Sequence, residues 1–521
     1  MNWAREVAER VVRERPNEEV YTVASGVSPS GFVHIGNFRE IATPYLVAKE
    51  LKNMGKNVRF ILSIDDFDRF RKVPGNIDSS FEKYIGMPYT AIPSPFEGAE
   101  TYAEYMTNRF LGELEAMDVE VECIYQTNEY KSGRYAEDIK KAMDRRGEIF
   151  DIIDEFRTQD AEEGEKERFY PISIFCPECG KDDTTISSYD EKSGEVKYSC
   201  KCGYEGSLDI LEARNIKLQW KVDWPMRWMA EKVTFETGGA DHSAANGSKA
   251  VSEEIVKKIY DYLPPVYIPY NFIGVKGGDA KMSSSKGNVL TITDLLKVYD
   301  KNIIWWFYTR FAPMHPFDIA LDNDVIRYYS EFDRWVKMYF GGNIDDKNKE
   351  IIALTGVQED YLNNPNFSYL ATFLPIVNND VELLKELLSK ENIDCDSWFF
   401  DKRLEMAKYW VETYGEKYRI TLLKERNDEF YNTLTDEEKG WLDKTKELLD
   451  EEYKTSDDLQ TALYAVVKDG VLEDKELKKV QKRYFQILYN MLLGKDKGPK
   501  LGLFLMAIDK DKIKNLLWLY K

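Results

Sequence analysis

The stretch SGVSPSGFVHIGN, residues 25–37, decides the fold class because it joins an apolar strand to a helix. Residues 19–24 before it predict the strand, whereas three glycines, three serines and a proline within it prevent regular structure. A helix is expected from about residue 38 to 54, and residues 57–65 predict a second strand with an acidic end. This order of elements indicates a parallel α/β unit, in which ligands bind at the carboxyl ends of the strands.

Composition divides the rest of the chain into further parts. The α/β pattern covers residues 1–86 and returns at 216–320, which predicts one Rossmann-like α/β domain built from two segments. Between them, residues 87–215 contain a proline-rich bend, amphipathic helices and four clustered cysteines, and we interpret them as an insertion. Residues 321–521 show helical periodicity with few glycines, so we expect a separate all-α domain there.

Bulk composition bounds the class of protein. The 521 residues, 43% of them hydrophobic, are enough to bury several cores. Because there is no run of about 18 apolar residues and no signal-peptide core, we expect a soluble, cytoplasmic protein with no membrane partner. The formal net charge of −20 argues against a protein that holds nucleic acid by non-specific charge alone, although a local basic surface is compatible with it.

Two polar residues at the start of the first α/β helix form a candidate phosphate site. His34 and Asn37 lie one turn apart, where free backbone N–H groups and the helix dipole attract an anion. Gly31 and Gly36 let a nucleotide approach the backbone closely. Taken alone, the same pattern is also that of a glycine-rich turn with an incidental histidine.

A second motif, KMSSSKGN at residues 281–288, precedes a predicted helix and carries two cations, Lys281 and Lys286. A loop rich in serine and lysine is usually a solvated surface loop. Both motifs nevertheless occur together, in order, each at a strand-to-helix junction, which favours a shared phosphate site over coincidence. The pair resembles the HIGH and KMSKS signatures of the class I aminoacyl-tRNA synthetases, with Asn37 in place of the second histidine and Ser285 in place of the second lysine.

This resemblance implies that the protein activates an amino acid with ATP. In such a reaction a carboxylate attacks the α-phosphorus and pyrophosphate leaves, so catalysis depends on positioning and electrostatic stabilisation and needs no nucleophilic side chain. The implied catalytic residues are His34, Asn37, Lys281 and Lys286, the last substituting for the missing lysine one place earlier. The residues implied to bind ATP, together with Mg²⁺, are His34, Gly36, Asn37, Lys281, Met282 and Ser283.

Further segments narrow the resemblance to one amino acid. They are similar to the class I lysyl-tRNA synthetases of archaea and some bacteria, and they read ASGVSPSGFVHIGNFRE, DDFDRFRKVP, NIKLQWKVDWPMRW, GADH, YNFIGVKG and GPKLGLFLMAI. The resemblance implies that L-lysine is attached to its tRNA through a lysyl-adenylate, first at the 2′-hydroxyl of the terminal ribose. The Rossmann-like domain would then be catalytic, and the helical domain would bind the tRNA anticodon.

The same resemblance implies a pocket for lysine. Two aromatic rings can enclose the aliphatic stem and face the ammonium, and Ser28 stands where a threonine is expected. The residues matched to this pocket are Gly26, Ser28, Trp220, His242 and Tyr270. A carboxylate should complete the recognition of the ammonium, and the sequence leaves four candidates open, Glu40, Asp65, Asp66 and Asp241.

The segments CPECG and CKCG have the spacing of a four-thiolate zinc ribbon, with ligands Cys176, Cys179, Cys200 and Cys202. The alternative, four reduced buried cysteines, is disfavoured because a glycine after each pair allows tight turns around one ion. Four cysteines leave no open coordination position, so we predict one structural Zn²⁺. Residues 94–105, where some relatives carry a second site, offer no soft ligand.

Two rival functions can be weighed against this interpretation. A glutamate- or glutamine-specific relative would need an arginine near Gly26 and His242, where acids are found instead. A non-catalytic paralogue that only binds RNA usually loses one phosphate motif, and both are kept here. The contacts of the helical domain with tRNA stay open, with basic and aromatic candidates Arg403, Trp410, Lys424 and Arg426.

Overall fold

The computed structural model of the chain describes residues 2–159, 161–240, 242–244, 246–277, 289–377, 379–389, 393–419, 421–468 and 474–518. The chain divides into two compact units. Unit 1 consists of Met1–Leu295, Lys301–Ile319 and Ile344–Gly356, and unit 2 consists of Leu296–Asp300, Ala320–Asn343 and Val357–Lys521. Each helix in the described part of the chain is too short or too polar to cross a membrane.

A five-stranded sheet forms the centre of unit 1, with the order β10-β9-β1-β2-β3 and every neighbouring pair parallel. The strands are β1 (Tyr21–Val27), β2 (Val58–Ile64), β3 (Glu122–Tyr125), β9 (Val233–Gly239) and β10 (Val266–Tyr270). All of β9 is buried, as expected of a central parallel strand covered on both faces. The chain builds outward from β1 to β3 on one side and from β9 to β10 on the other, so the order reverses between β1 and β9. Open parallel sheets bind ligands at this kind of reversal.

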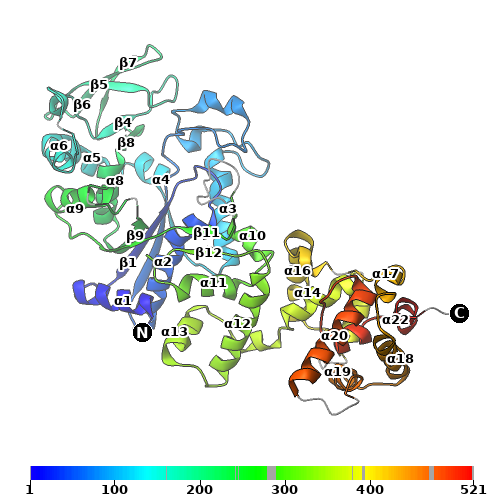
Figure 1. Cartoon of the computed structure of the whole chain (residues 1–521). Coiled ribbons are helices and arrows are strands. Elements are labelled where there is room, and N and C mark those ends of the chain that lie inside the picture. The colour runs from blue at the N-terminus through cyan, green and yellow to red at the C-terminus, as the bar shows by residue number, and fades with distance from the viewer. Residues whose placement is uncertain are drawn as a thin grey trace. The chain divides into compact units, whose positions relative to one another are not determined.

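Helix α2 (Ile35–Asn53) lies against β1 and β9 (Figure 1) and is buried along most of its length. It also packs on α11 (Lys301–Arg310), where the ring centroid of Phe38 lies 5.9 Å from that of Trp305 and 5.4 Å from that of Tyr308. Tyr308 donates a hydrogen bond of 2.9 Å to the carbonyl of Ile35, the first residue of α2. These contacts hold the N-terminus of α2 at the carboxyl end of β1.

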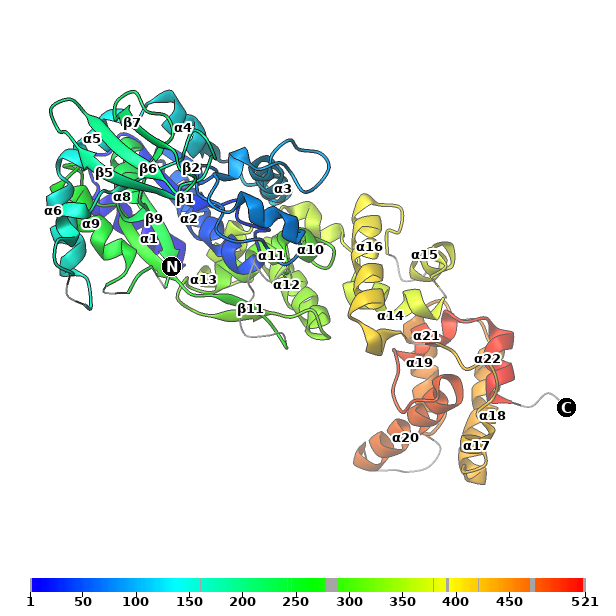
Figure 2. The same cartoon turned by 90° about the horizontal axis from the view of Figure 1, so that it is seen from above.

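The segment between β3 and β9 shares the hydrophobic core of unit 1 with the central sheet. Ile139, Val196 and Ile61 belong to one buried cluster, and Figures 1 and 2 both show β5, β6 and β7 beside α5. Its elements are α4 (Gln126–Ser132), α5 (Ala136–Asp144), α6 (Arg146–Glu155), α7 (Glu165–Arg168), β4 (Ile172–Ile174), β5 (Thr184–Tyr189), β6 (Glu195–Cys200), β7 (Glu205–Asp209), β8 (Ile216–Leu218) and α8 (Trp220–Ala230). The other elements outside unit 2 are α1 (Trp3–Glu14), η1 (Ser79–Tyr84), η2 (Tyr89–Ala91), α3 (Tyr102–Ala116), α9 (Ser248–Lys258), β11 (Ile273–Val275), α10 (Ile292–Leu296), β12 (Phe317–Ile319) and α13 (Asp346–Leu354).

The described part of unit 2 is built from helices around aromatic residues. Tyr329 stacks on Phe367 with ring centroids 3.9 Å apart, and Phe367 in turn packs against Trp410. The elements are α12 (Asp324–Phe340), η4 (Glu359–Asn363), α14 (Phe367–Ile376), α15 (Val381–Ser389), α16 (Trp398–Thr413), η5 (Glu416–Tyr418), α17 (Asp428–Tyr431), α18 (Asp436–Asp450), α19 (Ser456–Ala465), α20 (Asp474–Leu493), α21 (Leu501–Met506) and α22 (Lys510–Leu517). The parallel sheet and the helical C-terminal region, both predicted from the sequence, are confirmed.

Candidate active site

A cavity of about 300 Å³ opens at the reversal between β1 and β9. It is lined by residues from β1 and the turn after it, from α2, from α8, from β9 and from β10. Nine residues singled out in the sequence line this one cavity, namely Gly26, Ser28, Gly31, Asn37, Glu40, Asp65, Trp220, His242 and Tyr270. Segments far apart in the chain therefore meet in one cavity at the carboxyl edge of the sheet.

His34 is the N-cap of α2, which begins at Ile35, three residues before the helix start expected from the sequence. Its Nδ1 atom accepts hydrogen bonds from the backbone N–H of Gly36 at 3.1 Å and of Asn37 at 3.2 Å. The imidazole itself therefore occupies two of the helix N-terminal donors that the sequence suggested for an anion. Burial lowers the pKa of His34 to about 4, so the ring is neutral at pH 7. With Nδ1 as acceptor, the ring proton is on Nε2, which is left as a donor.

Gly36 is needed because the histidine ring lies directly over it. A Cβ atom at this position would lie 3.0 Å from both Cε1 and Nδ1 of His34 and 3.4 Å from the carbonyl oxygen of Ile273. Any larger side chain would therefore push the ring off its cap. The glycine serves the placement of His34 as well as the approach of a ligand.

The second phosphate motif falls outside the described residues, and with it Lys281, Met282, Ser283 and Lys286. The chain that follows it is described, and the carbonyl of Leu290 accepts a hydrogen bond of 2.9 Å from the backbone N–H of Ile35. Just beyond, the hydroxyl of Thr293 donates to the buried carboxyl of Glu113 at 2.8 Å. The chain leaving the motif is thus joined to the residue next to His34.

The acidic candidates for binding an ammonium differ in their surroundings. Asp65 lines the cavity and pairs with Arg227 at 2.5 Å, while Asp66 accepts a hydrogen bond of 2.8 Å from the backbone N–H of Thr127 and is not among the lining residues. Glu40 also lines the cavity, and Asp241 lies outside the described residues. Burial raises the pKa of Asp65, and the Arg227 guanidinium opposes that effect.

Behind Asp65 lies a buried network of opposite charges. The carboxylate of Asp223 accepts from Lys217 at 2.9 Å and also from Arg227. Lys217 reaches Asp68 at 2.7 Å. Since each of these groups has a counter-charge, the network holds α8 and β8 to the end of β2 and leaves Asp65 already paired with a cation.

Glu236 on β9 also lines the cavity, and the sequence interpretation missed it. Its side chain is buried and accepts a hydrogen bond from the indole N–H of Trp228. Burial raises the pKa of Glu236 to about 7. A signal was available, because a glutamate in the middle of the otherwise uncharged strand sequence VTFETGG is rarely placed in a central strand without a role.

Three tryptophans pack against one another on one face of α8, next to the cavity. Trp220 stacks on Trp224 with ring centroids 5.2 Å apart and planes 15° apart, and Trp224 contacts Trp228 at 4.9 Å. Trp224 also packs edge-on against His242 at 6.3 Å and lines the cavity, although the sequence interpretation named only Trp220. The spacing of four residues along the helix is what lets the three rings meet.

The four clustered cysteines converge as their spacing predicts. Their Sγ atoms all lie within 4.8 Å of one another, in a cluster of Cys176, Cys179, Cys200 and Cys202. Gly180 and Gly203 after each pair have φ values of 74° and 98°, a left-handed conformation that glycine adopts without strain. Four thiolates at this separation suit a tetrahedral ion such as Zn²⁺ and leave no position for a reactive water.

Residues 94–105, considered above for a second metal site, are held by aromatic packing. The ring of Phe96 lies 4.6 Å from that of Tyr105 and 6.1 Å from that of Phe32. Arg109 lies over the Phe32 ring at 4.3 Å. These contacts connect the segment to the turn that carries the first phosphate motif.

Two of the residues considered in unit 2 for contact with tRNA belong to the core instead. Arg403 is 1% exposed and binds Asp333 at 3.0 Å and the carbonyl of Pro365 at 2.9 Å. Trp410 is fully buried and donates to the carbonyl of Leu321 at 2.8 Å. Of the other two, Lys424 is exposed and Arg426 is paired with Asp428. Arg403 and Trp410 are therefore structural.

Comparison with known proteins shows similarity along the whole chain. A family profile described as "tRNA synthetases class I (K)" matches residues 1–358. The chain is 35% identical to a lysine–tRNA ligase of Pyrococcus furiosus, with 98% of each chain covered. It is 34% identical to a lysine–tRNA ligase of Borrelia garinii, with 100% of this chain and 99% of that one covered. It is 33% identical to a lysine–tRNA ligase of Streptomyces coelicolor, with 99% and 98% covered.

Proposed function

The chain belongs to the class I tRNA synthetase family, and from this premise we propose that it is an ATP-dependent lysine–tRNA ligase. In the first step a carboxylate oxygen of L-lysine attacks the α-phosphorus of ATP, the bond to pyrophosphate breaks, and lysyl-adenylate forms. In the second, a hydroxyl of the terminal ribose of the tRNA, the 2′-hydroxyl in this class, attacks the lysyl carbonyl and AMP leaves. Both steps need positioned donors for phosphate oxygens more than a reactive side chain.

The proposal that the substrate is lysine rests on the charge of the residues that line the cavity. Among the described residues that line it, three are acids, Glu40, Asp65 and Glu236, and none is lysine or arginine. A glutamate-specific enzyme would need a cation at this place, whereas an ammonium finds carboxylates. Because Asp65 is already paired with Arg227, we assign the side-chain ammonium of the substrate to Glu236.

The remaining lining residues suit the rest of the amino acid. Trp220 and Tyr270 enclose the aliphatic stem, and Ser28 and His242 offer polar groups to the α-amino and α-carboxylate ends. Gly26, near the end of β1, lines the cavity without presenting a side chain to it. Burial of the stem together with pairing of the ammonium accounts for selection of lysine over shorter or uncharged amino acids.

The two phosphate motifs are assigned to ATP. The Nε2–H of neutral His34 and the amide of Asn37 donate to phosphate oxygens, and Gly36 keeps the His34 ring in place. Lys281 and Lys286, together with Met282 and Ser283, close over the pyrophosphate from the second motif. Mg²⁺ enters with ATP and neutralises part of the phosphate charge.

The other parts of the chain receive structural and RNA-binding roles. The four cysteines hold one structural Zn²⁺ within an insertion, residues 87–215, of a catalytic domain formed by 1–86 and 216–320, and this insertion also supplies β3 to the central sheet. Residues 321–521 bind the anticodon part of the tRNA for lysine. As part of protein synthesis, the enzyme acts in the cytoplasm.

Amino-acid-dependent ATP–pyrophosphate exchange tests the proposal directly. Exchange is expected with lysine and not with glutamate, and Lys281→Ala should lower its rate on the order of a hundredfold or more, since a mobile cation at the phosphates stabilises developing charge. Exchange with glutamate would overturn the choice of substrate. Tight tRNA binding without any exchange would show an RNA-binding paralogue instead.

A further inference from the structure

Helix α3, which follows the proline-rich bend, contacts the turn that carries the first phosphate motif. At its first residue, the Tyr102 hydroxyl donates a hydrogen bond of 3.1 Å to the carbonyl of Ser30. Two turns further along the helix, the guanidinium carbon of Arg109 lies 4.3 Å from the centroid of the Phe32 ring. Phe110, the next residue, lines the cavity of the candidate active site, as does Phe32. Helix α3 therefore lies along the turn between β1 and α2.

The same helix also holds the chain that leaves the second phosphate motif. Glu113 is buried, and its carboxyl accepts a hydrogen bond of 2.8 Å from the hydroxyl of Thr293. At the C-cap of α3, the carbonyl of Met117 accepts from the indole N–H of Trp305 at 3.0 Å. Arg109 and Glu113 are four residues apart, so they lie on the same face of the helix. Arg109 is thus placed next to contacts with both motifs.

The guanidinium of Arg109 has hydrogen-bond donors that the fold does not use. Arg109 is half-buried, and within the part of the chain that the structure describes it forms neither an ion pair nor a hydrogen bond. Its charge opposes the rise in the pKa of Glu113 that burial causes, but the Glu113 carboxyl is bonded to Thr293. Stacking uses the flat face of a guanidinium and leaves the N–H groups at its edge, where they can bind two oxygens of one phosphate.

The ring under this guanidinium is itself held in place. Phe96 stacks on Phe32 with ring centroids 6.1 Å apart and planes 29° apart, and the ring of Phe96 lies 4.6 Å from that of Tyr105. All three rings pack against a buried cluster that contains Tyr102. A cation that is already positioned over a fixed ring loses little freedom when it binds a ligand.

The first motif supplies donors for phosphate but no positive charge. The ring of His34 is neutral because burial lowers its pKa to about 4, and Asn37 is an amide. Among the described residues that line the adjoining cavity there is neither lysine nor arginine. Negative charge on the phosphates must nevertheless be stabilised as the α-phosphorus is attacked and pyrophosphate leaves. A cation on an ordered helix beside the motif can stabilise that charge.

We propose that Arg109 is a further ATP-binding residue, whose guanidinium donates to oxygens of the β- and γ-phosphates and stabilises the departing pyrophosphate. Arg109 is not among the residues that line the cavity assigned to the amino acid, and it lies over the turn that leads to His34. Its helix also holds Thr293, just beyond the motif whose lysines are assigned to the same pyrophosphate. The inference rests on the proposed function, since it concerns the same reaction.

ATP–pyrophosphate exchange by the full chain tests this role, with lysine, ATP and pyrophosphate varied separately. Arg109→Met keeps an unbranched stem over Phe32 but removes the charge, so kcat/KM for ATP should fall on the order of a hundredfold. The KM for inorganic pyrophosphate should rise, while the KM for lysine should stay near the wild-type value. Arg109→Lys keeps the charge without the planar fork and should recover only part of the loss.

Asn108→Asp is the matched control for this substitution. It makes the same change of net charge at the neighbouring residue of α3, whose side chain is exposed. We expect its exchange kinetics to stay close to those of the wild type. Equal losses in Arg109→Met and Asn108→Asp would mean that net charge alone is responsible and would overturn the proposal.

A non-hydrolysable sulfamoyl analogue of lysyl-adenylate separates phosphate binding from a structural role. It occupies the site but lacks pyrophosphate, so its inhibition constant for Arg109→Met should equal that for the wild type. Inhibition weakened as much as exchange would show a distorted site and would contradict the proposal. Wild-type exchange with slow transfer of lysine to tRNA would move Arg109 to a tRNA phosphate and would contradict it too. Absence of lysine-dependent exchange in the wild type would overturn the proposed function itself, whereas the other failures overturn this inference alone.

Discussion

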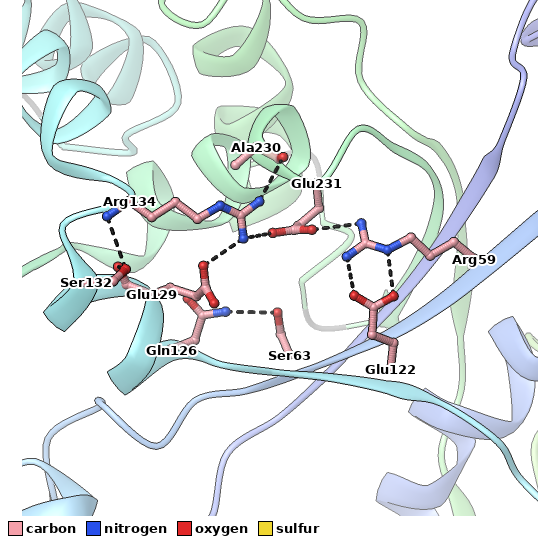
Figure 3. Close-up of polar contacts among 9 residues, drawn as sticks. All are labelled: Arg59, Ser63, Glu122, Gln126, Glu129, Ser132, Arg134, Ala230 and Glu231. Carbon is pink, nitrogen blue, oxygen red and sulfur yellow. Dashed lines mark hydrogen bonds and ion pairs between the residues drawn. The ribbon is translucent and has the colours of Figure 1, made fainter.

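Two buried glutamates near β9 show how one sheet uses charge in two ways. Glu231 precedes β9 at the amino end of the sheet, and Figure 3 shows it between the guanidinium groups of Arg59 and Arg134. The distances are 2.8 Å to Arg59 and 2.6 Å to Arg134, and Arg59 also binds Glu122. The charges at this end of the sheet are therefore paired with one another without a ligand. These ion pairs join β2, β3 and the end of α8.

Glu236 lies within β9, faces the cavity and is surrounded differently. Its hydrogen-bond donor is the neutral indole of Trp228, and among the described residues no cation pairs with it. Burial raises its pKa to about 7, and the Trp228 hydrogen bond and the charge of Arg227 only partly oppose that effect. The comparison teaches that a compensated buried carboxylate holds the fold together, while an uncompensated one beside a cavity is suited to a cationic substrate.

Glu236→Gln should have the largest effect on activity. The amide keeps the shape of the side chain but removes the charge, so kcat/KM for lysine in pyrophosphate exchange should fall on the order of a hundredfold, since loss of one partner of a buried charge pair costs about 2–5 kcal/mol. The free energy of unfolding in urea should stay unchanged or rise slightly. An unchanged kcat/KM would show that Glu236 does not bind the substrate ammonium.

Glu231→Gln is the matched substitution at the other end of the sheet. It leaves Arg59 and Arg134 without their shared counter-charge, and we expect the free energy of unfolding to fall by about 2 kcal/mol, less than for fully buried pairs because both arginines are partly exposed. Urea denaturation measures this loss. The KM for lysine should stay at the wild-type value, and an increase like that of Glu236→Gln would show that the two ends are not distinct.

The pH dependence of lysine binding sharpens the role of Glu236. The substrate side-chain amine stays protonated below about pH 10, whereas Glu236 loses its proton near pH 7. Binding needs the ammonium and the carboxylate together, so the KM for lysine should rise as pH falls from 8 to 6, approaching about tenfold per pH unit below the pKa. Steady-state exchange across this range measures it. Glu236→Gln should abolish the dependence, and a pH profile shared by both proteins would assign it to another group.

Gly36→Ala should have the smallest effect of the four. The added Cβ would lie 3.0 Å from the His34 ring, so we expect the ring to shift and kcat for exchange to fall by roughly fivefold, as misplaced phosphate donors do. The KM for lysine should change little. Gly112→Ala on α3 is the control, because nothing lies within 4 Å of its added Cβ. Equal activity of the two variants would contradict the positioning role of Gly36.

Several features of the site were predictable because they depend on neighbours in the chain. Turn chemistry at Gly31 and Gly36 predicted a strand-to-helix junction, and the spacing of four cysteines predicted that their sulfurs meet. The function of Glu236 was not predicted, because its burial depends on the pairing of β9 with both β1 and β10. The sequence also did not predict that Asp65 is already paired with a cation, because its partner Arg227 lies far along the chain.

The sequence by itself determined the parallel α/β unit, the helical C-terminal region, the cysteine cluster and the family of the chain. Hydrophobic periodicity, glycine turns and short spacings act over a few residues, so they can be recognised without coordinates. Only the tertiary structure decided which charges are paired and which are left for a ligand. It placed Arg403 and Trp410 in a core, made His34 a helix cap with a neutral ring, and left Glu236 beside the cavity, because burial and pairing depend on residues brought together from distant parts of the chain.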